Sequence, residues 1–172
     1  MSKSVSMICA LVTTFIWGTA FIAQDTGMDN IGPLTFNSAR FVVGFLTIIP
    51  FAIFFEKEKI KIEINSKSKL FIKYLIFMGI SLFLGTFLQQ AALQYTNIAN
   101  AAFFTVFYVP LVPILLFIIY SQKIHWSIWP AIILCVMGVY LLSDFSNSEI
   151  MLGDALVILC SVFWALHIIF AG

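Results

Sequence analysis

Long apolar runs alternate with short polar connections along the whole chain. A helix needs about 20 predominantly apolar residues to cross the hydrocarbon core of a bilayer. The pattern therefore predicts an all-α integral membrane protein with a bundle of six transmembrane helices. The predicted helices cover approximately residues 5–23, 34–55, 70–93, 99–120, 128–142 and 153–172. For the first run, which follows Lys3, a signal peptide with a cleavage site at Gly18-Thr19-Ala20 is the alternative interpretation.

Composition supports the membrane interpretation. Of the 172 residues, 62% are hydrophobic and 10% are charged, whereas soluble domains carry roughly 25% charged residues. The expected environment is a lipid bilayer, and we expect no nucleic acid partner. The three cysteines lie inside apolar runs without Cys-x-x-Cys spacing, so they are predicted to be buried thiols. We expect no metal site and no cofactor.

Charge distribution predicts the orientation of the chain. The stretch from Glu56 to Lys73 contains six lysines against three glutamates, so the positive-inside rule makes it a cytoplasmic loop whose charges face water and anionic lipid. The loop from Ser143 to Leu152 contains Asp144 and Glu149 but no lysine, which is typical of the outer side. The N-terminus is therefore predicted to be cytoplasmic.

Residues 85–113 carry amides and hydroxyls at depths where a bilayer supplies no water. Such groups normally face the interior of a bundle or a water-filled cavity. Ser81, Gly85 and Gln89 recur at i+4 spacing; we expect the first two to serve helix packing. Gln89 and its neighbour Gln90 are predicted to line a cavity, because two adjacent amides exceed what packing needs.

The fourth apolar run contains two prolines after its polar positions. Thr105 and Tyr108 lie on adjacent turns of one helix face, and Pro110 and Pro113 follow. Proline removes a backbone donor and bends a helix, either as a plain kink or as part of a site. In the second run, Arg40 is the chain's one arginine. Its side chain is long enough either to face the bundle or to reach the headgroups, and both readings stay open.

An internal repeat is detectable at an offset of roughly 147 residues, following the usual search for self-similarity. Phe15-Ile16-Trp17-Gly18 aligns with Val162-Phe163-Trp164-Ala165. Because five helices separate the two copies, a tandem repeat of this unit must be inverted in the membrane, as in many secondary transporters. The predicted organisation is one five-helix repeat over residues 1–142, then an outer loop and the first helix of a truncated second repeat over residues 143–172.

Several short motifs resemble the drug/metabolite transporter superfamily, EamA type. They are Trp17-Gly18-Thr19-Ala20-Phe21, Ala39-Arg40-Phe41, Ala92-Leu93-Gln94-Tyr95-Thr96, Ala101-Ala102-Phe103, Pro110-Leu111-Val112-Pro113, Gly138-Val139-Tyr140-Leu141-Leu142 and Gly153-Asp154-Ala155-Leu156 through Phe163-Trp164-Ala165-Leu166. The resemblance implies a ten-helix permease of two inverted repeats. The Phe-rich and Ile-rich composition with a single arginine indicates a bacterial genome, so the expected location is the bacterial inner membrane. The resemblance also implies export or exchange of amino acids or other small metabolites by alternating access through a central cavity. The expected partners are the missing second repeat and, optionally, a second copy in a homodimer.

The predicted substrate site combines the polar and aromatic positions between the midplane and the outer surface. They are Trp17, Arg40, Gln89, Gln90, Thr105 and Tyr108. Such a cavity suits an uncharged or zwitterionic solute, with Arg40 available for a carboxylate.

No Asp or Glu is expected within a hydrophobic segment, so this half offers no acidic proton carrier. His167 is the remaining intramembrane group that titrates near neutral pH, and it is either packed or a proton switch.

An intramembrane enzyme would need paired nucleophile and base or metal ligands, and the motifs for these do not occur in the sequence. A non-catalytic membrane subunit or scaffold is the other alternative, and a large polar cavity would argue against it.

Overall fold

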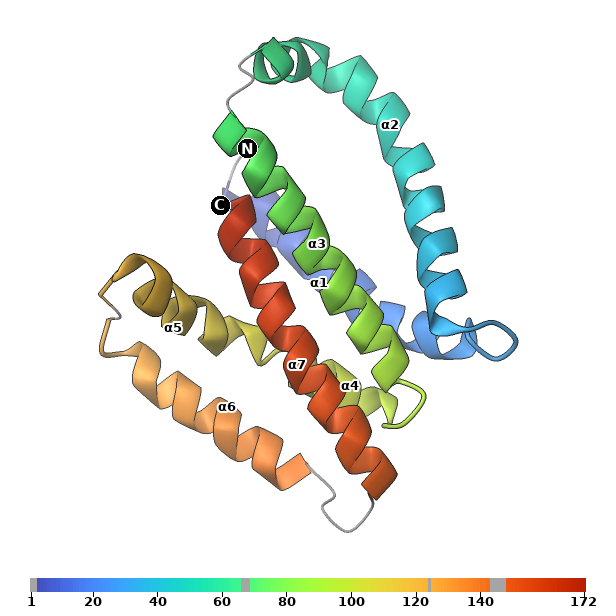
Figure 1. Cartoon of the computed structure of the whole chain (residues 1–172), viewed down its shortest axis with the longest axis vertical. Helices are drawn as coiled ribbons and strands as arrows, with labels where there is room; N and C mark the ends of the chain where they lie inside the picture. Colours follow the sequence, from blue (N-terminus) through green and yellow to red (C-terminus); the bar gives the residue numbers. More distant parts are fainter. Residues whose placement is uncertain (1–2, 66–68, 124, 143–147) are drawn as a thin grey trace.

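The computed structural model describes residues 3–65, 69–123, 125–142 and 148–172 (Figure 1). Over these residues every regular element is a helix, which confirms the predicted all-α fold. The helices are α1 (Lys3–Thr26), α2 (Pro33–Asn65), α3 (Lys69–Ala92), α4 (Ile98–Thr105), α5 (Tyr108–Tyr120), α6 (Ile128–Leu142) and α7 (Ser148–Ala171).

Most of these helices are long and apolar enough to cross a membrane. Five candidate spans occur among the described residues: Lys3–Thr26, Pro33–Phe55, Phe71–Ala92, Ile98–Tyr120 and Leu152–Ala171. The apolar stretch of α6, Ile128–Gly138, is shorter. Large apolar side chains such as Phe54 and Phe55 stay more than 80% exposed, which suits helices that face lipid instead of water. The chain is therefore an integral membrane protein with several spans.

Helices α4 and α5 form one span with a break at Val106 and Phe107. Asn97 caps the start of α4, because its side chain accepts a hydrogen bond from the backbone N–H of Asn100 over 2.8 Å. The interruption lies just before the two prolines, Pro110 and Pro113, which both belong to α5. Pro110 has no N–H for the carbonyl of Val106, which accepts a tighter bond from Val109 instead.

Helices α3 and α7 form the centre of the bundle. They run antiparallel and lie side by side, and α4 and α5 also contact α7 (Figure 1). A Cβ atom at Gly85 of α3 would lie 3.5 Å from Phe163 and Trp164 of α7, which is ordinary van der Waals distance. Gly85 thus serves helix packing, as its spacing predicts.

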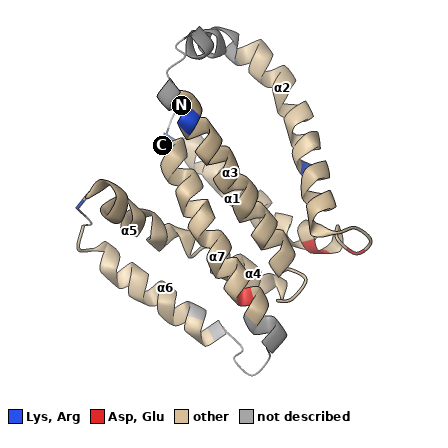
Figure 2. Ribbon diagram, viewed as in Figure 1, with Lys and Arg blue, Asp and Glu red and all other residues tan. Residues whose placement is uncertain are grey.

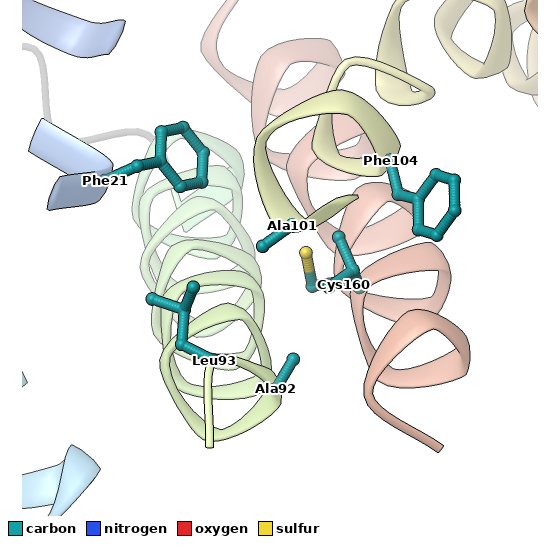
Figure 3. Packing of buried hydrophobic residues seen from close by; sticks show 7 residues of the cluster. Phe21, Ala92, Leu93, Ala101, Phe104 and Cys160 are labelled. Carbon is teal, nitrogen blue, oxygen red and sulfur yellow. The ribbon is translucent and has the colours of Figure 1, made fainter. Parts of the chain in front are cut away.

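A small apolar core joins α1, α3, α4 and α7 (Figure 3). Its buried members are Phe21, Ala92, Leu93, Ala101, Phe104, Val157 and Cys160. Phe104 and Ala101 come from α4, so this short helix is held between α3 and α7. The core lies beside the ends of α1 and α3 and fixes the helices that carry the polar residues described below.

Two helices extend beyond the predicted membrane segments, whose bounds agree with the candidate spans Pro33–Phe55 and Leu152–Ala171. Helix α2 continues to Asn65, through much of the predicted lysine-rich loop, and α7 begins at Ser148 instead of Gly153. Glu and Lys are good helix formers, so a helix can continue beyond its apolar stretch without a break. The parts of these loops at residues 66–68 and 143–147 lie outside the described residues.

The described lysines and aspartates lie toward opposite ends of the bundle, as the colours of the ribbon show (Figure 2). Lys3 begins α1 and Lys73 lies in the second turn of α3. Asp25 and Asp29 lie where α1 meets α2, and Asp154 lies near the start of α7. Helix α7 runs antiparallel to α3, so Asp154 near its start lies at the opposite end of the bundle from Lys73. The described lysines at the start of α1 and α3 therefore lie at one end, and the aspartates lie at the other.

Candidate functional site

A cavity of about 510 Å³ lies between α1, α2, α3 and α7. Apolar side chains such as Phe45 and Leu82 make up part of its wall. The polar and aromatic side chains that line it are Trp17, Gln24, Arg40, Thr86, Gln89 and Trp164. The described residues that line the cavity include no acidic side chain, so Arg40 gives it a positive charge.

Gln89 connects the cavity to α4. Its side-chain Nε2 donates to Thr105 Oγ1 over 2.8 Å, and that hydroxyl donates in turn to the carbonyl of Ala101 over 2.7 Å. Both Gln89 and Thr105 are buried. Gln89 is among the residues that line the cavity, and Thr105 is not. Thr105 lies behind Gln89 and holds the Gln89 amide in place.

Gln90 points to the neighbouring helix α1. Its Nε2 donates to the backbone carbonyl of Gln24 over 3.0 Å, and Gln24 Nε2 donates to the carbonyl of Ala20 over 3.1 Å. In each of the two side-chain amides the nitrogen donates a hydrogen bond, whereas the oxygen has no hydrogen-bond partner. Gln90 is fully buried, so it touches the cavity only through Gln24.

Three buried side-chain atoms of the described residues have no hydrogen-bond partner: Gln24 Oε1, Gln90 Oε1 and Trp164 Nε1. Gln24 and Trp164 line the cavity, and Gln90 binds Gln24. More than 90% of buried polar groups in proteins find a partner, because an unpaired one is costly in apolar surroundings. The unpaired Gln24 Oε1 and Trp164 Nε1 thus belong to residues of the cavity wall, whereas the unpaired Gln90 Oε1 lies behind that wall.

Arg40 lines this cavity, in agreement with the bundle-facing alternative of the two that the sequence leaves open. Its Nη2 donates to Asn37 Oδ1 over 2.7 Å, and Asn37 Nδ2 donates to the carbonyl of Thr86 on α3 over 3.0 Å. The guanidinium carbon also lies 5.8 Å and 5.4 Å from the ring centres of Phe36 and Phe41. These partners are neutral, so they orient the cation without cancelling its charge.

Aromatic rings from three helices meet beside the cavity. The ring centre of Trp17 on α1 lies 6.1 Å from that of Tyr108 on α5 and 6.2 Å from that of Trp164 on α7. Tyr108 thus supports Trp17 from behind and is not itself among the residues that line the cavity. Trp17 and Trp164 are the two tryptophans that the internal repeat aligns, and the fold brings them into contact.

A sequence profile of the EamA-like transporter family matches residues 4–144. The chain belongs to the EamA-like transporter family. An uncharacterized transporter of Archaeoglobus fulgidus is 30% identical over 158 residues, which cover 91% of this chain and 46% of that relative. The EamA-like chain thus spans about half the length of the curated relative it matches. No solved structure matches the chain.

Sequence reasoning missed several residues of this EamA-like site. Asn37 and Thr86 support Arg40, while Gln24 and Trp164 line the cavity. Trp164 was detectable as the repeat partner of Trp17, but nothing in its local sequence placed it opposite that residue. Gln24 and Asn37 stand at helix ends, where polar side chains usually face water, so their burial became visible only with the packed helices.

The prediction that no acidic residue lies within an apolar segment is wrong. Asp154 in α7 is only 4% exposed. Its Oδ1 accepts from the Thr96 hydroxyl over 2.6 Å, and both carboxylate oxygens lie 3.4 Å from Asn100 Nδ2. The turn between α3 and α4 folds over the start of α7 and buries the carboxylate. Asp154 does not line the cavity, so its visible role is to join α7 to the α3–α4 turn.

His167 is engaged in packing. Its Nδ1 lies 3.1 Å from the backbone carbonyl of Met78 on α3, and its ring meets the edge of Trp164 at 6.1 Å between centres. These contacts match the packed alternative for this residue. They place His167 next to the cavity wall but behind Trp164.

Proposed function

We propose that the EamA-like chain forms part of a membrane transporter that moves small carboxylate-bearing metabolites, such as amino acids, through the cavity between α1, α2, α3 and α7. The observation that carries this proposal is the cavity itself. Its lining residues combine the cation of Arg40 with an unpaired acceptor on Gln24 and an unpaired donor on Trp164. A membrane subunit with a purely structural role would not need this combination of polar groups around a cavity.

The chemistry of the walls suits a zwitterion. A guanidinium binds a carboxylate through short, charge-assisted hydrogen bonds. The free amide oxygen of Gln24 suits an ammonium donor, and Trp17 and Trp164 offer aromatic faces for an apolar side chain. A cationic solute would meet Arg40 without a balancing acidic wall residue, so the proposed site disfavours it.

The proposed mechanism is alternating access, with a second, inverted repeat as the opposite wall of the pathway. In this proposal residues 1–142 form one five-helix repeat and residues 143–172 open an inverted second one. The contact between Trp17 and Trp164 supports the idea, since residues matched by a two-fold repeat meet near its axis. The lysines at one end and aspartates at the other support a cytoplasmic N-terminus in a cell membrane, which we propose to be the bacterial inner membrane.

Uptake by proteoliposomes that contain the full-length protein tests this function. We expect labelled L-alanine or L-phenylalanine to exchange across the membrane, and we expect Arg40→Gln to reduce that flux at least about tenfold because a charge-assisted contact is lost. Thr47→Val, at an exposed position of the same helix, is the control and should transport normally. Equal flux in the Arg40→Gln variant and the wild type would overturn the assignment of the cavity.

A further inference from the structure

We infer that Asn37 is the positioning residue that gives the cavity its selectivity for carboxylates, because it orients Arg40 while leaving the cation unneutralised. This inference rests on the proposed transport function. It concerns a residue that lies outside the cavity lining and acts on the solute only through Arg40.

The orientation of the Asn37 amide is fixed by its two partners. The carbonyl of Thr86 can only accept a hydrogen bond, and the guanidinium of Arg40 can only donate. Nδ2 must therefore face Thr86 at 3.0 Å, and Oδ1 must face Arg40 at 2.7 Å. With 6% of its surface exposed, Asn37 has little freedom to turn away. One side chain of α2 thus connects the backbone of α3 to the cation of the site.

Few other side chains can perform both tasks. An aspartate would accept from Arg40 but could not donate to Thr86 when ionised, and its charge would cancel that of Arg40. An alanine would leave the guanidinium held only by the rings of Phe36 and Phe41, which attract a cation without fixing its direction. An amide orients the donor and keeps the positive charge available.

An arginine in an apolar bundle needs compensation, because a buried or half-buried cation is costly. At Arg40 the compensation consists of one amide oxygen and two aromatic rings. A guanidinium has five N–H donors, so this arrangement leaves donors for a ligand. A carboxylate supplies both acceptors and the missing negative charge. The carboxamide of the same solute supplies one acceptor and no charge.

The test compares an amino acid with its carboxamide in proteoliposomes that contain the full-length protein. L-Phenylalanine and L-phenylalaninamide are the probes, and KM, maximal flux and the ratio of the two fluxes are measured. For Asn37→Asp we expect KM for the amino acid to rise at least about tenfold and the preference for the carboxylate to disappear. For Asn37→Ala we expect KM to rise while a weaker preference remains, because Arg40 keeps its charge.

The variants also separate this inference from the proposed function. In an Arg40→Gln background, the neutral Asn37→Ala substitution should cause no further rise in KM for the amino acid, since Asn37 acts only through Arg40. If Arg40→Gln abolishes the preference and Asn37→Asp leaves it intact, Asn37 is not the positioning residue but the transport proposal stands. If Arg40→Gln changes nothing, the proposed function itself fails. Should Asn37→Asp fail to fold, a normal KM in Asn37→Ala would be enough to overturn the inference.

Discussion

The hydroxyl of Thr96 donates a 2.6 Å hydrogen bond to Asp154 Oδ1, across 58 positions of sequence. Thr96 lies in the turn between α3 and α4, and Asp154 lies near the start of α7. Asn100 adds a second, longer contact to the same carboxylate. This contact joins the α3–α4 turn to α7, the helix that contributes Trp164 to the wall of the cavity.

Removal of this carboxylate should destabilise the bundle. In Asp154→Ala the buried hydroxyl of Thr96 and the amide of Asn100 lose their acceptor, and an unpaired buried polar group costs about 1–3 kcal/mol. We expect a clear fall in the thermal unfolding midpoint of the purified protein in detergent. Asp29→Ala is the matched control, because Asp29 is exposed in the α1–α2 connection. Equal midpoints for the two variants would argue against a stabilising role for the contact.

The glycine before Asp154 should tolerate no larger side chain. A Cβ atom at Gly153 would lie 2.7 Å from the backbone nitrogen of Thr96, closer than real contacts allow. At Gly85 the nearest atoms are 3.5 Å away. We therefore expect Gly153→Ala to lower the unfolding midpoint by displacing the turn from α7, and Gly85→Ala to stay within about 0.5 kcal/mol of the wild type. A midpoint of Gly153→Ala equal to that of Gly85→Ala would contradict the close approach.

Thr105 should affect transport through Gln89. Thr105→Val keeps the shape of the side chain but removes the acceptor for Gln89 Nε2, which then stays buried without a partner. We expect a loss of about 1–3 kcal/mol in the free energy of unfolding and a moderate rise in KM, because the amide can turn. Gln89→Leu should impair transport more, since it removes the group that lines the cavity. A normal KM in both variants would show that Gln89 does not contact the solute.

Tyr108 is expected to act through its ring. It stacks on Trp17 at 6.1 Å but does not line the cavity. Tyr108→Phe should therefore transport at nearly the wild-type rate, while Tyr108→Ala should lose flux because Trp17 loses its support. Such aromatic pairs contribute about 0.5–1.5 kcal/mol beyond the area they bury. If Tyr108→Phe were as impaired as Tyr108→Ala in the uptake assay, the hydroxyl and not the ring would be the functional group.

Sequence patterns predict the membrane-spanning elements well, since helix length in a bilayer is set by hydrocarbon thickness. The runs around Trp17 and Gln89 are both found as helices with nearly the expected bounds. Hydrocarbon thickness does not limit a helix outside the bilayer, and there α2 continues beyond its predicted segment to Asn65 and α7 begins before its predicted segment, at Ser148. Polar side chains in the middle of an apolar run are an equally strong signal, and they identify Gln89 and Gln90 as residues that face the bundle interior.

What the sequence does not contain is the pairing of helices. Whether a polar residue near a helix end is buried depends on which segment packs over it, as with Asp154 beneath the α3–α4 turn. The same holds for Asn37, whose two partners lie three positions away on its own helix and on a different helix. The division of roles between Gln89 at the cavity and Thr105 behind it follows from helix packing alone.

The most direct test of the central claim is protection of the cavity by its solute. Gly44 lines the cavity and has open space around it, so Gly44→Cys should place a thiol on the wall without strain. In proteoliposomes with the full-length protein, we expect L-phenylalanine to slow the reaction of this thiol with a methanethiosulfonate reagent. Gly79→Cys, also in open space but away from the cavity lining, is the control and should react at an unchanged rate. Equal reaction rates at the Gly44→Cys thiol with and without the amino acid would contradict the claim that this cavity holds the transported solute.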